Sequence, residues 1–92
     1  MRIEVDDLTV ENAARVKREA LNAWTKGERT FDFSAVRHVD SAALALVASL
    51  VRRAEAEGAR VTFTGLPAGL RSLAELYGVD ALLDEYLPPA AR

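Results

Sequence analysis

The sequence lacks cysteine, and its 92 residues include only three prolines, five glycines, one tryptophan and one histidine. The absence of cysteine excludes disulfides, thiolate nucleophiles and most structural zinc sites, and it is typical of a reducing compartment. Few glycines and prolines combined with 50% hydrophobic residues are typical of a folded globular domain rather than a disordered chain. We therefore expect a single domain over residues 1–92, with residues 86–92 as a loose tail.

The sequence also lacks a large excess of charge of either sign. Twelve Lys and Arg residues stand against fourteen Asp and Glu residues, which gives a net charge of −2. Such a balance provides no basic field for holding a phosphate backbone, so we expect no nucleic-acid partner. The first residues have neither the pattern of a secretion signal nor the length of a membrane span. A cytoplasmic protein that reaches the inner membrane only through a partner is expected.

Motifs for catalysis and cofactor binding are absent. Neither G-x-x-x-x-G-K-[ST] nor G-x-G-x-x-G occurs, so the chain has no phosphate-binding loop of its own. One histidine and scattered carboxylates do not form a recognisable metal-ligand set. His38 lies three residues before Ser41 on an extended segment, and this odd spacing places the two side chains on opposite faces. We predict no catalytic residue, no cofactor and no metal.

Hydrophobic periodicity predicts an α/β domain. Alternating residues indicate strands near residues 3–5, 30–33 and 60–64, with a fourth from residues 36–39 or from a partner. The 3.6-residue period indicates helices over residues 9–25 and 42–56 and a third from Pro67, followed by a short turn at residues 79–83. Thr9 is the expected cap of the first helix, with Val10 on its apolar side, and Tyr77 is expected on the apolar stripe of the third. Gly58 is placed for a left-handed C-cap.

The second predicted helix begins directly after an acid and a hydroxyl. Asp40 and Ser41 both suit the N-cap, because a side-chain oxygen there accepts from free backbone N–H groups of the first turn. Ala42 and Ala43 keep the surroundings small, which would let a partner approach closely. A phosphate on Ser41 would gain from the helix dipole and would be repelled by Asp40. Capping, docking and a phosphorylation switch are all compatible with these residues.

Four segments in this order and spacing resemble a STAS domain over about residues 3–83: Phe31–Val36, Val39–Val47, Arg60–Pro67 and Leu70–Val79. The resemblance implies a mixed sheet of about four strands with helices packed on it. It also implies that the chain is not an enzyme and acts by docking on other proteins. The strand that the family usually contributes before residues 2–5 is missing here, so we expect either an open sheet edge or a start upstream of Met1.

Two branches of the family resemble this sequence in different degrees. Anti-sigma factor antagonists carry D-S-S-G, with phosphate on the second hydroxyl, where this chain has Ala42. The small STAS subunit of the bacterial phospholipid (Mla) ABC transporter carries D-T-G-G-L-A-L-L, which is similar to Asp40–Val47, with Ser41 at the threonine position. The run Leu73–Val79 is also similar to that subunit. The transporter branch is therefore favoured.

The resemblance to the transporter branch implies a partner and a contact surface. The expected partner is the ATPase subunit of the ABC transporter, which the chain would stabilise or regulate. The expected contact residues are His38, Asp40, Ser41, Ala42, Ala43 and Leu44. The alternative is an anti-sigma factor antagonist in which an anti-sigma factor kinase phosphorylates Ser41.

Overall fold

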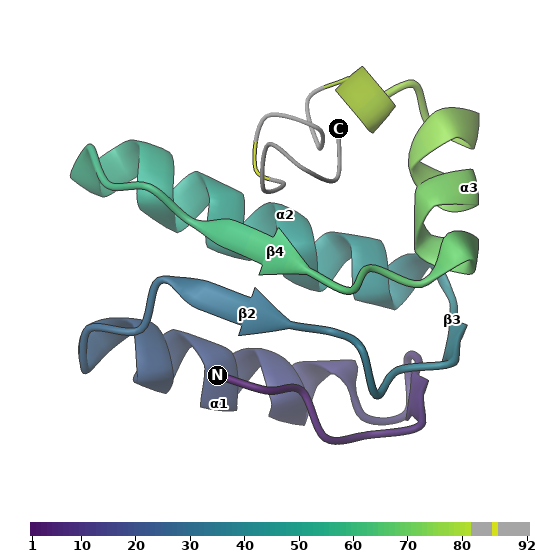
Figure 1. Cartoon of the computed structure of the whole chain (residues 1–92), viewed down its shortest axis with the longest axis horizontal. Coiled ribbons are helices and arrows are strands. Elements are labelled where there is room, and N and C mark those ends of the chain that lie inside the picture. The colour runs from purple at the N-terminus through teal and green to yellow at the C-terminus, as the bar shows by residue number, and fades with distance from the viewer. Residues whose placement is uncertain (82–85, 87–92) are drawn as a thin grey trace.

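Short strands alternate with three helices in the computed structural model, which describes residues 1–81 and Tyr86 (Figure 1). The elements in chain order are β1 (Asp7–Leu8), α1 (Ala13–Thr25), β2 (Thr30–Asp32), β3 (His38–Val39), α2 (Ser41–Glu57), β4 (Thr62–Thr64) and α3 (Ala68–Leu76). The predicted α/β class is confirmed. In Figure 1, α1 and α2 each bring the chain back so that β2 and β4 run in the same direction.

The strands form two small sheets whose described pairs are all parallel. β2 pairs with β4, and β1 pairs with β3. An isolated bridge between Arg2 and Asp32 joins the first residues to β2, so residues 1–8 run beside residues 30–39. The register shifts by one residue between that bridge and the Asp7–His38 pair, because a turn at Phe33–Val36 adds a residue. The described part of the chain therefore provides the parallel strands of the expected mixed sheet.

The strand predicted at residues 3–5 is wrong in its position. Ile3 donates its N–H to the carbonyl of Asp32 at 2.8 Å and its side chain is buried, but regular pairing begins only at Asp7. The carbonyl of Asp6 accepts from the N–H groups of both Arg37 and His38, which starts the β1–β3 ladder directly before Asp7. The fourth strand expected from residues 36–39 is β3.

The core lies between the helices and the strands. α2 buries residues at i, i+3, i+4 and i+7 spacing, and α1 buries a narrower stripe of four residues at i, i+3, i+7 and i+11. Phe63 of β4 lies edge-on to Phe33, with ring centroids 6.0 Å apart. The largest fully buried side chains are Trp24, Phe31, Phe33, Phe63, Ile3, Leu8, Leu46, Leu50 and Leu70, followed by Val16 and Val47.

The helix ends differ in part from the prediction. Asn12, not Thr9, directly precedes α1. The backbone carbonyl of Thr9 accepts from the N–H groups of Asn12 and Ala13, which forms a turn before the helix begins. Val10 therefore lies outside the helix and is 77% exposed. Tyr77 lies one residue beyond α3 and is 59% exposed, so it is not part of the buried stripe. The predicted left-handed cap at Gly58 is confirmed, with φ of +64°.

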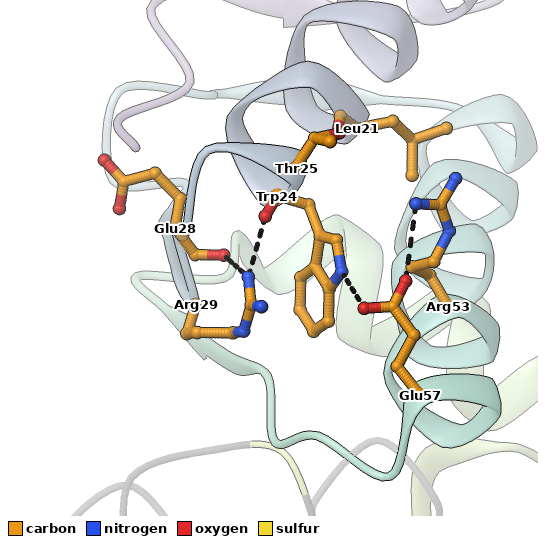
Figure 2. A network of polar contacts seen from close by, with 7 residues as sticks. All are labelled: Leu21, Trp24, Thr25, Glu28, Arg29, Arg53 and Glu57. Carbon is orange, nitrogen blue, oxygen red and sulfur yellow. Dashed lines mark hydrogen bonds and ion pairs between the residues drawn. The ribbon is translucent and has the colours of Figure 1, made fainter.

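A polar network fastens the C-terminal ends of α1 and α2 to each other (Figure 2). The buried Trp24 donates its indole N–H to Glu57 at 3.0 Å, and Arg53 holds the other carboxylate oxygen at 3.4 Å. The guanidinium of Arg29 lies 3.8 Å from the centre of the Trp24 ring and donates to the Trp24 carbonyl. Because α2 has 17 residues, this network is about 24 Å from Ser41.

The C-terminal part of the chain is only partly described. Residues 82 and 83 of the predicted short turn and residues 87–92 of the predicted tail lie outside the described residues, whereas residues 80 and 81 are helical. Tyr86 is described: its carbonyl accepts the N–H of Phe63, and its ring lies edge-on to Phe63. None of the helices in the described part of the chain has both the length and the apolar character that crossing a bilayer requires.

Candidate functional site

Asp40 joins the start of α2 to the loop before α1. Its Oδ1 accepts from the N–H of Ala42 at 2.8 Å, which is the predicted N-cap bond. Its Oδ2 accepts from the N–H of Val10 at 2.9 Å. Both carboxylate oxygens are therefore used within the chain, and Asp40 positions the surface around it.

Ser41 is the first residue of α2 and is exposed. Its hydroxyl makes no hydrogen bond to any other described residue, in contrast to Ser49, whose hydroxyl bonds to the carbonyl of Ala45. Ala42 and Leu44 beside it are half-buried. We call Asp40, Ser41, Ala42 and Leu44 the Ser41 end of α2. It offers one unbonded hydroxyl surrounded by small or apolar side chains.

Ala43 and His38, which were predicted as contact residues, do not lie with the Ser41 end of α2 on one exposed surface. Ala43 is 0% exposed, so its methyl group packs in the core, and we remove it from the predicted surface. His38 is exposed on β3, where its Nδ1 lies 2.8 Å from Oδ1 of Asp7. That bond holds the imidazole toward β1, and no hydrogen bond joins it to Ser41. Within the described residues, no base is therefore hydrogen-bonded to Ser41.

An apolar groove runs along α2 from Ser41. It has a volume of about 420 Å³, and the aromatic rings of Tyr77 and Tyr86 line it together with side chains of α2. At the far end, the Tyr86 hydroxyl donates to Glu55 at 3.0 Å. We call this the tyrosine groove. Its described lining residues are Ser41, Leu44, Ala45, Val47, Ala48, Val51, Arg52, Glu55, Tyr77, Val79 and Tyr86.

A second, smaller groove lies on the other side of the exposed face of α2. It has a volume of about 240 Å³ between α1 and α2, and we call it the interhelix groove. Its described lining residues are Val10, Ala13, Ala14, Lys17, Ala42, Ala45, Leu46 and Ser49. Ala45 lines both grooves. Sequence reasoning missed both grooves because it assigned Val10 and Tyr77 to buried stripes.

One group of side chains could in principle bind a metal ion. One oxygen each of Asp6 and Asp7 and a ring nitrogen of His38 lie within 4.8 Å of one another, and all three residues are exposed. Within the chain, Asp7 already bonds to His38, and Asp6 lies 3.7 Å from the Nε of Arg37. Contacts within the chain, the Asp7–His38 hydrogen bond and the Asp6–Arg37 ion pair, therefore account for this cluster.

Comparison with known proteins finds a family. The model of a family described as "Mlab, STAS domain" matches residues 5–84, which is most of the chain. No curated protein and no solved structure shows a significant match. The match includes the Ser41 end and most of the lining of both grooves.

Proposed function

This chain belongs to the STAS domain family, which has a general protein-interaction or regulatory role, and we propose that it binds and regulates the ATPase of a phospholipid-trafficking ABC transporter. In this proposal it is a non-catalytic subunit that acts in the cytoplasm. It reaches the inner membrane only through the transporter.

The observation that carries this proposal is the exposed Ser41 end of α2. An unbonded hydroxyl, small neighbours and two adjoining apolar grooves form a surface on which another protein can pack closely. The single hydroxyl directly after Asp40 and the Mlab description of the matching family both support the transporter branch.

The surroundings of Ser41 support a binding role rather than catalysis. A serine nucleophile needs a base within hydrogen-bond reach and a group that orients that base. The lone histidine bonds to Asp7, and Asp40 accepts two backbone N–H groups. No hydrogen bond in the described part of the chain links the Ser41 hydroxyl to either group, so neither is placed as its base in this geometry.

Co-purification with the ATPase subunit tests the proposal. We expect Ser41→Lys to abolish binding, because a long cation occupies the space where the partner packs. Ser72→Lys is the matched control, since Ser72 is exposed on α3 and lines neither groove. The helix dipole costs Ser41→Lys about 0.3–1 kcal/mol, so circular dichroism should show a folded protein. Binding of Ser41→Lys at the wild-type level would refute the proposed surface.

The second candidate is an anti-sigma factor antagonist that is regulated by phosphorylation. The exposed, unbonded hydroxyl of Ser41 favours it, because a kinase could reach it directly. Intact-mass analysis after incubation with an anti-sigma factor kinase and ATP distinguishes the two functions. A gain of one phosphate that Ser41→Ala abolishes would support the antagonist, and an unchanged mass would support the transporter subunit.

A further inference from the structure

Residues 1–5, which we call the N-terminal edge, run beside β2 on the side away from β4 (Figure 1). The carbonyl of Met1 and the N–H of Ile3 both bond to β2 at 2.8 Å. Because backbone groups alternate in direction along an extended strand, those of Arg2 and Glu4 point away from β2. Neither residue makes a backbone hydrogen bond to another residue in the described part of the chain. An unpaired edge of this kind is a template for a strand of another chain.

The side chains of the N-terminal edge alternate between the two faces of the sheet. Ile3 is buried, and Met1 and Val5 are half-buried against the core. Arg2 and Glu4 are exposed, and neither forms a close ion pair with another described residue. Charges of one sign along an edge oppose pairing with a second copy. This edge carries one charge of each sign, so its charges do not oppose such pairing.

One antiparallel register satisfies both the backbone and the charges of two copies. When Ile3 of one copy lies opposite Ile3 of the other, Arg2 lies opposite Glu4, and these two residues exchange both backbone hydrogen bonds. Met1 then lies opposite Val5 on the core face, where the two apolar side chains cover each other. Registers shifted by two residues set Arg2 against Arg2 or Glu4 against Glu4, and a shift by one sets core-facing side chains against solvent-facing ones. The edge is therefore self-complementary in one register.

We propose that a second copy of this chain pairs with the N-terminal edge, so that a two-fold antiparallel contact joins the β2–β4 sheets of the two copies. The contact is only a few residues long and buries less than the roughly 1,200 Å² of a typical stable interface. The dimer is therefore reversible and forms at high micromolar concentration. The N-terminal edge contains no residue of the Ser41 end or of the described lining of either groove, so dimerisation does not use the proposed docking surface.

Sedimentation of the full-length chain over a range of concentrations tests the dimer. We expect the wild type to shift from monomer toward dimer as its concentration rises. Glu4→Lys should self-associate about tenfold more weakly, because each Arg2 then faces a second cation. Arg2→Glu should weaken association by a similar factor, because each Glu4 then faces a second carboxylate. Glu75→Lys is the matched control, since it changes the net charge as Glu4→Lys does at an exposed position on α3, and it should associate like the wild type.

Mixing the two reversed variants separates edge pairing from damage to the fold. An equimolar mixture of Glu4→Lys and Arg2→Glu sets opposite charges against each other again at both positions, so we expect it to associate at the wild-type level. Circular dichroism checks the fold of each variant, because the charge of Arg2 also acts on Asp32. A wild-type chain that stays monomeric at millimolar concentration, or reversed variants that associate like the wild type, would overturn the proposal. Binding of the ATPase subunit should be unchanged in both variants, so loss of the dimer leaves the docking function intact.

Discussion

At the scale of single residues, Gly65 occupies the most constrained position among the described glycines. Its φ is +64°, and a Cβ built on it would lie 2.8 Å from the backbone nitrogen of Ser34. That N–H also donates to Asp32 at 2.9 Å and, together with the Ser34 hydroxyl, lowers the pKa of the Asp32 carboxyl. Ser34 is therefore held from one side by Asp32 and cannot move away freely.

Gly65→Ala and Gly58→Ala form a matched pair. Both glycines have φ of +64°, but a Cβ on Gly58 meets no atom within 4 Å. We expect Gly58→Ala to lower the free energy of unfolding by about 1 kcal/mol, from backbone strain alone. Gly65→Ala should lose about 2–4 kcal/mol, because overpacking adds to the same strain. Urea denaturation followed by Trp24 fluorescence measures both, and equal losses would contradict the close contact with Ser34.

The side chain of Asp40 makes two hydrogen bonds, one to the N–H of Ala42 and one to the N–H of Val10. Asp40→Ala removes the cap of α2 and the bond to Val10, and we expect it to cost about 1–2 kcal/mol. Asp40→Asn should cost less, because an amide oxygen still caps the helix while the NH₂ group cannot accept from Val10. Urea denaturation ranks the two variants. Equal stability of Asp40→Asn and Asp40→Ala would contradict a stabilising N-cap bond from position 40.

At the scale of elements, Trp24 fixes α1 against α2 at the end far from Ser41. Trp24→Phe removes the bond to Glu57 and weakens the stacking of Arg29. We expect a loss of about 2 kcal/mol of stability, measured by urea denaturation and circular dichroism. Binding of the ATPase subunit should not change. A Trp24→Phe protein of wild-type stability would show that the network contributes little.

The ends of the helices show which boundaries sequence patterns predict correctly and which they do not. α2 was predicted within a residue at each end, because its helix formers are continuous and Gly58 provides a defined stop. Val10 and Tyr77 fit the helical period equally well, yet both lie outside their helices. The turn at Thr9 delays the start of α1 to Ala13, and α3 ends at Leu76, before the left-handed Gly78. Hydrophobic periodicity does not detect such turns. The grooves were missed for the same reason, since their exposed residues had been assigned to the core.

At the scale of the whole molecule, the Trp24 network and the proposed binding surface lie at opposite ends of α2. The Trp24 network holds the C-terminal end, and the Ser41 end presents the proposed surface. The sequence indicated the Asp40–Leu44 segment as the candidate surface, and within it the structure buries Ala43. The second bond of Asp40 could not be predicted, because it depends on how the loop before α1 meets α2. Variants at the two ends should therefore separate folding from binding.

The absence of cysteine permits the most direct test of docking at the Ser41 end. A single thiol is introduced by Ser41→Cys or, as the control, by Ser72→Cys, and its alkylation rate is followed by mass spectrometry with and without saturating ATPase subunit. The proposed docking predicts that the partner strongly slows alkylation at position 41 and leaves position 72 unchanged. A bound complex in which position 41 reacts as fast as in the free chain would contradict it.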